Sequence, residues 1–250
     1  MTVLLALEEV SRRFGGLQAV DRVSFTVDAG EIVGLIGPNG AGKTTLINLI
    51  TGVHPASAGR VQFDGRDITR LRPHQIARLG LARTFQIVQP FPKMTVVENV
   101  AAGALFAGGA SHLRDALVAA REHLALTGLA DSADKPAVTL TLAQRKRLEL
   151  AKGLAMKPRL LMLDEVHAGL NPTEIDEALH MIRKIAGQGV TIVVIEHLMK
   201  VVLAISQRIV VLHHGQLIKT GHPNEVLRDR SVIEAYLGAK YASAYSEGRA

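Results

Sequence analysis

Residues 35–46 have the sequence LIGPNGAGKTTL, and this stretch limits the possible fold more than any other part of the chain. An apolar segment leads into a turn rich in glycine, which is followed by a lysine and two threonines. The glycines allow backbone conformations that other residues avoid. Successive main-chain N–H groups in such a turn form a concave site for a small anion. The stretch therefore predicts a strand, an anion-binding loop and a helix, in that order.

The spacing within this stretch matches the phosphate-loop pattern of eight residues, which begins at Gly37 and ends at Thr44. The helix that follows directs its positive end at the same anion. Lys43 is predicted to reach the β- and γ-phosphates of a nucleoside triphosphate, and Thr44 to offer its hydroxyl to Mg²⁺. The residues expected to contact the nucleotide here are Gly37, Asn39, Gly40, Ala41, Gly42, Lys43, Thr44 and Thr45.

A second apolar stretch, LLML, ends in two acids, Asp164 and Glu165. A phosphate-loop site needs an acid at the end of a neighbouring strand to hold Mg²⁺, and Asp164 fits that role. Glu165 is one residue further on, where it would face a water attacking the γ-phosphate, as general base or as water-positioning group. The alternative is that two acids merely cap a buried strand.

Two other polar residues end predicted strands. His197 follows VTIVVIE, and a helix over about 173–187 separates this strand from the acid strand. Parallel strands present their carboxyl ends at one edge of a sheet, so His197 is expected near Glu165 and the γ-phosphate. Gln86 ends LARTF and is predicted to bridge Mg²⁺, the water and the helical segment that follows. A packing or surface role is the alternative for both residues.

Composition narrows the class of protein. The chain has 250 residues, of which 48 % are hydrophobic, but no apolar run reaches the ~18 residues of a membrane-spanning helix. The N-terminus becomes acidic before an export signal is complete, and the lack of cysteine is compatible with the cytosol. The net charge is +6, with scattered basic residues and only 4 % aromatics, which argues against a nucleic-acid partner.

The order of these features predicts an α/β core interrupted by a helical segment. Short strands dominate residues 3–36, the pattern is helical from about 93 to 157, and apolar strands alternate with helices beyond it. We predict one domain over 1–250, with a core of about 1–92 and 158–250 and a helical subdomain of about 93–157.

In this order and spacing, the phosphate loop, Gln86, the helical segment, Asp164–Glu165 and His197 resemble the ATP-binding cassette (ABC) ATPases over essentially the whole chain. The resemblance implies a P-loop NTPase core with an N-terminal antiparallel β subdomain and an inserted α-helical subdomain. It also implies ATP and Mg²⁺ as ligands, with Thr44, Gln86 and Asp164 holding the metal.

The family signature Leu-Ser-Gly-Gly-Gln is altered here to LTLAQ, Leu140–Gln144. In the family, two subunits enclose ATP head to tail, and each signature contacts the γ-phosphate held by the other. Thr141 and Gln144 fit a capping box, which preserves the helix start. Leu142 and Ala143 replace the glycines and would crowd the phosphate, so the resemblance implies a working but weakened or asymmetric half-site. An inactive signature is the alternative.

Other positions are carried over from the family. Phe14 resembles the aromatic residue that stacks on adenine, and Val20 is expected to line the same pocket. The segment AGLN, 168–171, resembles the family's D-loop, with Asn171 where most members have aspartate. Val166 replaces the proline that often follows the glutamate.

Several segments are similar to the ATPase subunits of branched-chain amino-acid importers, the LivG-like branch; among them are RRFGGLQAV and AGLNPTE. This implies ATP-driven uptake, with transmembrane permease subunits, a second ABC ATPase and, indirectly, a solute-binding protein as partners. It also implies a peripheral position on the cytoplasmic face of the inner (plasma) membrane. The alternatives are a weakly hydrolytic regulatory half of a heterodimer and a non-transport ABC ATPase.

Overall fold

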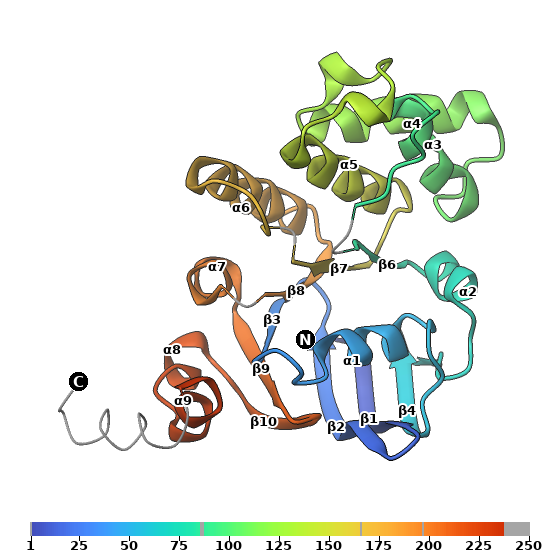
Figure 1. Cartoon of the computed structure of the whole chain (residues 1–250). Coiled ribbons are helices and arrows are strands. Elements are labelled where there is room, and N and C mark those ends of the chain that lie inside the picture. Colours follow the sequence, from blue (N-terminus) through green and yellow to red (C-terminus); the bar gives the residue numbers. More distant parts are fainter. Residues whose placement is uncertain (1, 86–87, 166, 197, 238–250) are drawn as a thin grey trace. The chain divides into compact units, whose positions relative to one another are not determined.

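The computed structural model describes residues 2–85, 88–165, 167–196 and 198–237 (Figure 1). Contacts divide the chain into two compact units, one of Met1–Leu71 with Val193–Ala250 and one of Arg72–Ile192. Each unit is described by itself. The helical subdomain expected over 93–157 falls within the second unit, and its status as a separate subdomain stays a prediction.

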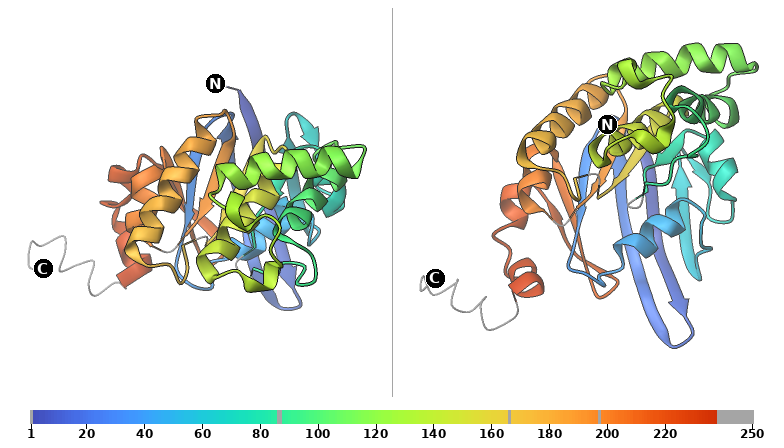
Figure 2. Two further views of the ribbon diagram at one scale, coloured as in Figure 1. Left: turned by 90° about the horizontal axis from the view of Figure 1, so that it is seen from above. Right: turned by 45° about the horizontal axis from the view of Figure 1, so that its top comes forward.

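The first unit contains an antiparallel sheet with the strand order β2-β1-β4-β5. Figure 2 shows its long hairpin, β1–β2, in blue. Along β2, Val23, Phe25 and Val27 are buried while the residues between them are exposed, which is the period-two pattern of a strand covered on one face. The strands are β1 (Val3–Phe14), β2 (Leu17–Asp28), β4 (Ala58–Phe63) and β5 (Arg66–Asp67).

The same unit contains parallel strands that lead to the glycine-rich loop. Strand β3 (Ile32–Ile36) is buried along its whole length and pairs in parallel with β9 (Arg208–His213). Strand β9 pairs antiparallel with β10 (Gln216–Gly221). Helix α1 (Lys43–Ile50) follows β3 after the loop. The expected order of strand, loop and helix is thus confirmed.

Three C-terminal helices of the first unit complete an apolar cluster around β3 and β9. They are α7 (Met199–Ile205), α8 (Pro223–Val226) and α9 (Arg230–Leu237). Ile36, Val202 and Val232 are members of this cluster, and Tyr236 packs against it. Burial raises the pKa of Tyr236 to about 12, as expected for a phenol in apolar surroundings. The strand before the loop therefore has a packed, apolar face.

The second unit begins with α2 (Pro73–Arg78) and β6 (Leu81–Arg83), which pairs in parallel with β7 (Leu160–Asp164). The strand expected over LARTF is shorter than predicted, because β6 ends at Arg83. Helix α6 (Pro172–Ala186) follows β7, close to the predicted 173–187, and β8 (Thr191–Ile195) is the strand at which the chain passes into the first unit.

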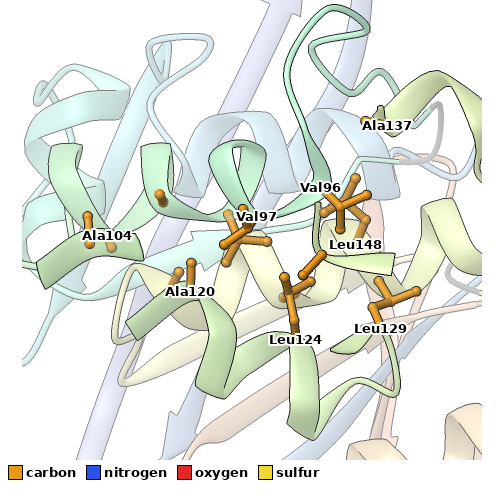
Figure 3. Close-up of a cluster of buried hydrophobic side chains, with 14 of the residues drawn as sticks. Val96, Val97, Ala104, Ala120, Leu124, Leu129, Ala137 and Leu148 are labelled. Atoms are coloured by element: carbon orange, nitrogen blue, oxygen red, sulfur yellow. The ribbon is translucent and has the colours of Figure 1, made fainter. Parts of the chain in front are cut away.

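The helical segment between β6 and β7 has its own apolar core, shown in Figure 3. It is built by α3 (Val96–Phe106), α4 (Leu113–Leu126) and α5 (Leu142–Ala155), and Val96, Leu124 and Leu148 are completely buried in it. Helix α3 comes close to α5 at Gly103, where a β-carbon would lie 2.7 Å from the carbonyl oxygen of Lys152. Within the described part of the chain, no helix has the length and apolarity needed to cross a bilayer.

Leu124→Ala tests the contribution of this helical core to stability. Leu124 is 0 % exposed, so we expect the free energy of unfolding to fall by about 2–5 kcal/mol because a cavity replaces the side chain. Leu113→Ala is the matched control on the same helix, since Leu113 is 58 % exposed, and should change stability by less than about 0.5 kcal/mol. Urea unfolding measures both; equal losses would contradict the assignment of the core.

Candidate functional site

The loop between β3 and α1 passes so close to neighbouring main chain that two of its positions require glycine. Gly42 has a φ of 98°, and a β-carbon there would lie 2.5 Å from the carbonyl oxygen of Ala19. A β-carbon on Gly37 would lie 2.2 Å from the carbonyl oxygen of Leu212. The opposing atoms are backbone and cannot rotate away. The loop is therefore held from behind while Asn39 and Gly40 stay exposed.

Lys43 folds back over the loop that precedes it. Its Nζ donates to the carbonyl oxygens of Gly37, at 2.7 Å, and Pro38, at 3.1 Å. The first turn of α1 contains no acidic residue, and Thr44 on that turn is exposed. The Lys43 ammonium, the start of a helix and an exposed hydroxyl thus lie together beside the loop. This combination suits an anion with several oxygens.

Phe14, at the end of β1, is 39 % exposed. The guanidinium carbon of Arg12 lies 4.5 Å from the centre of its ring, and the His54 ring meets it edge-on with the ring centres 5.5 Å apart. Arg12 is in turn held by the carbonyl oxygen of Pro55, at 2.9 Å. Phe14 thus has one face covered by a cation. Val20, expected in the same pocket, is completely buried.

In the second unit, Asp164 lies at the end of β7 and forms a buried ion pair. Its Oδ2 is 3.0 Å from Nη2 of Arg83, and these side chains are only 6 % and 9 % exposed. The Asp164 main-chain N–H donates to Oγ1 of Thr84, at 3.1 Å. Burial lowers the pKa of Arg83, an effect that the Asp164 carboxylate opposes. Arg83 supplies the positive charge that a buried carboxylate needs.

Glu165 follows Asp164 with a φ of 46°, in the left-handed region that residues with long side chains rarely occupy. Its carbonyl oxygen accepts hydrogen bonds from Nζ of Lys146, at 3.0 Å, and from the main-chain N–H of Ala168, at 3.2 Å. Lys146 comes from α5 and is only 8 % exposed. Glu165 therefore sits on a sharp turn that α5 contacts directly.

The predicted capping box at the start of α5 is confirmed. Thr141 Oγ1 accepts from the Gln144 main-chain N–H at 3.3 Å, and Gln144 Oε1 accepts from that of Thr141 at 3.0 Å. Leu142 leans on the segment after β7, where a β-carbon added to Gly169 would lie 2.8 Å from Leu142 Cδ2. Ala143 lines a small, mostly apolar cavity between α5 and α6. Leu142 and Ala143, which stand where the family signature has glycines, thus leave the helix cap intact.

Asn171 caps α6 through its side chain, which accepts from the main-chain N–H of Glu174 at 3.0 Å. Gln86, Val166 and His197 lie outside the described residues, so their predicted roles stay predictions. The phosphate-loop residues and Phe14 belong to the first unit, whereas Asp164, Glu165, Thr141 and Gln144 belong to the second.

Sequence reasoning missed Arg83 and Lys146. Arg83 is the one basic residue of ARTFQ, and Lys146 is one of three in QRKRLE. No spacing rule marks either residue as buried. Only the fold places one beside Asp164 and the other beside the carbonyl of Glu165.

The fold and the loop define a nucleotide-binding protein of the P-loop class. A family model described as "ABC transporter" matches residues 20–168. The chain is 40 % identical over 249 residues to the high-affinity branched-chain amino acid transport ATP-binding protein BraF of Pseudomonas aeruginosa. It is also 40 % identical over 249 residues to LivG of Escherichia coli K12, which has the same description; each alignment covers 94 % of this chain and 98 % of the relative.

Solved structures agree with this assignment. The crystal structure of a nucleotide-free ATP-binding cassette from an ABC transporter matches with a TM-score of 0.86 at 32 % identity, over 95 % of this chain and 100 % of that one. The ADP conformation of MJ1267, an ATP-binding cassette of an ABC transporter, matches equally well. The chain therefore belongs to the ABC transporter family, as one of its ATP-binding cassettes. The predicted fold class and class of protein are confirmed.

Arg83→Gln tests the buried ion pair. It leaves the Asp164 carboxylate buried without this partner, so we expect the free energy of unfolding at pH 7 to fall by about 3–5 kcal/mol. Arg147→Gln is the control, because Arg147 pairs with Glu177 at an exposed site and its loss should cost less than about 1 kcal/mol. Chemical unfolding measures both variants. An Arg83 variant as stable as the Arg147 variant would show that the pair is not needed.

Proposed function

We propose that this chain is the ATP-hydrolysing subunit of an importer for branched-chain or related amino acids. The observation that carries the proposal is the loop at 37–44, where the backbone behind the loop requires glycine at positions 37 and 42 and the outer side is open. The relatives named for branched-chain amino-acid transport support the solute class, because identity to them extends over nearly the whole chain.

In this proposal the loop binds the phosphates of ATP. The Lys43 ammonium exchanges the carbonyl oxygens of Gly37 and Pro38 for β- and γ-phosphate oxygens. The main-chain N–H groups of the loop, with the hydroxyls of Thr44 and Thr45, complete the contacts. Adenine stacks on the face of Phe14 opposite Arg12, and Val20 supports the end of the loop from below.

Thr44, Asp164 and Gln86 would hold Mg²⁺ beside the phosphates. The donor set fits the ion, because a hydroxyl, a carboxylate and an amide oxygen are hard ligands. The Asp164 carboxylate is paired with Arg83 in this structure, and Mg²⁺ would compete with that ion pair for it. When bound, Mg²⁺ supplies charge neutralisation of the phosphate oxygens.

Hydrolysis is proposed to depend on Glu165 and His197. Glu165 orients the attacking water and accepts its proton as the water attacks the γ-phosphate. His197 donates a hydrogen bond to a γ-phosphate oxygen and steadies the charge that develops there. Gln86 links these groups to the helical subdomain, proposed to be residues 93–157.

A second ABC ATPase, permease subunits and, through them, a solute-binding protein are the proposed partners, at the cytoplasmic face of the inner membrane. Thr141 and Gln144 would contact the nucleotide bound by the second ATPase. ATP drives the change of shape because it binds the closed pair of cassettes better than the open pair. The intact cap at Thr141 supports a working signature over a purely regulatory subunit.

ATP hydrolysis by the purified chain tests the proposed chemistry. We expect Mg²⁺-dependent hydrolysis, a loss of about 10²- to 10⁴-fold in Glu165→Gln, and unchanged ATP affinity. The double variant Leu142→Gly/Ala143→Gly should raise the rate, since it restores the glycines at the helix start. Hydrolysis unaffected by Glu165→Gln would overturn the role of Glu165. A rate unmoved by the glycine pair would show that the altered signature is not limiting.

Uptake of labelled leucine tests the solute class. In cells that depend on this chain for the transporter, we expect the Glu165→Gln allele to reduce leucine uptake to background. Glu177→Gln is the control, because Glu177 is an exposed residue of α6. Uptake of a solute unrelated to amino acids should not change. Normal leucine uptake in cells carrying the Glu165→Gln allele would contradict the proposed solute while leaving the ATPase assignment in place.

A further inference from the structure

The main chain of Glu165 is strained. Its φ of 46° is the left-handed conformation, which glycine adopts freely but a residue with a long side chain avoids because its β-carbon crowds the backbone. Such a conformation persists only where surrounding contacts hold it. The residue in question is the one proposed to act on the attacking water, so the contacts that hold it affect the direction of its carboxylate.

One of these contacts comes from α5. Nζ of Lys146 lies 3.0 Å from the carbonyl oxygen of Glu165, and Lys146 is 8 % exposed. A buried ammonium is costly unless hydrogen bonds compensate it, so this hydrogen bond helps to stabilise Lys146 in its buried position. The same oxygen also accepts from the N–H of Ala168, at 3.2 Å, which closes the turn after β7. Lys146 therefore ties α5 to the peptide group that follows the strained residue.

A second contact joins α5 to the same turn. Leu142 approaches Gly169, which has a φ of 79°, and a β-carbon added there would lie 2.8 Å from Leu142 Cδ2. Leu142 and Lys146 are four residues apart, so they lie on one face of the helix. The first turns of α5 thus contact the turn after β7 at two places, Glu165 and Gly169. A displacement of α5 would therefore be transmitted to Glu165.

We propose that Lys146 is a positioning residue that holds the Glu165 main chain in its left-handed conformation and so sets the direction of the Glu165 carboxylate. The inference rests on the proposed role of Glu165 in hydrolysis. In the proposed pair of cassettes, the start of α5 serves the partner's nucleotide while Glu165 serves the nucleotide on its own chain. Lys146 then connects, within one chain, the helix that serves the partner's nucleotide to the residue that serves the chain's own nucleotide.

A double-mutant cycle on stability tests the tie without relying on activity. Lys146→Met is made in three backgrounds: wild type, Glu165→Ala and Glu165→Gly. Alanine keeps the strain at position 165, whereas glycine removes it. When the Lys146 contact is lost, a strained residue 165 can relax and recover its strain energy, whereas glycine has no strain to recover. We therefore expect Lys146→Met to lower the melting temperature in the wild-type and alanine backgrounds by at most half as much as in the glycine background. Lys146→Gln repeats the cycle where the methionine variant does not fold.

The outcomes of the cycle are distinct. Equal losses in all three backgrounds would mean that residue 165 keeps its conformation without Lys146, and the proposal would be wrong. No loss in any background would overturn it as well. Lys152→Met in the same three backgrounds is the control. Lys152 lies on the same helix and pairs with Glu149, so the fall in melting temperature caused by Lys152→Met should not depend on the residue at 165.

Steady-state kinetics give a second readout. Lys146→Met should lower kcat for ATP by about 10- to 100-fold at unchanged KM, because a misdirected carboxylate impairs chemistry and not binding. Lys146→Arg should recover part of the rate, and Lys152→Met should match wild type. A rise in KM at unchanged kcat would contradict the proposal. If wild type lacks ATPase activity, the proposed function fails, and the stability cycle still decides whether Lys146 holds the strained backbone.

Discussion

Close packing of backbone against backbone at the glycine-rich loop is the constraint on which the rest of the structure depends. Gly37 faces the carbonyl of Leu212 and Gly42 faces that of Ala19, at distances that exclude any side chain. Strands β2 and β9 thereby fix the inner side of the loop, and the apolar cluster around Ile36 fixes the strand that enters it. In the proposed function, a loop held this way would bind phosphate without the entropy cost of being ordered first. The open outer side is the part left for the ligand.

In the second unit, buried basic side chains fix the residues at the end of β7. Two basic side chains enter the region at the end of β7: Arg83 neutralises the carboxylate of Asp164, and Lys146 binds the carbonyl of Glu165. Arg83 is the last residue of β6, which precedes Gln86 in the sequence. Lys146 lies in α5, the helix that begins at the altered signature. Asp164, proposed for metal binding, is thus in contact with β6, and Glu165, proposed for hydrolysis, with α5.

Local sequence patterns predicted much of this. The strand, loop and helix at 32–50 were predictable because the glycine, lysine and threonine positions obey a fixed spacing, and the cap at Thr141 because capping is local. Arg83 and Lys146 were not predictable, because their roles depend on which strand or turn lies opposite them. The short helix α2 and the early end of β6 were also missed, since short elements are decided by tertiary contacts and not by periodicity.

Calorimetric titration of ATP into the purified chain, compared with Lys43→Ala, tests the central claim most directly. That claim is that the loop at 37–44 is a phosphate-binding site. The account predicts saturable binding of one ATP per chain, with affinity that falls at least tenfold in the Lys43 variant, while adenosine without phosphates binds both proteins equally weakly. Absence of ATP binding, or binding that does not respond to the loss of Lys43, would contradict it.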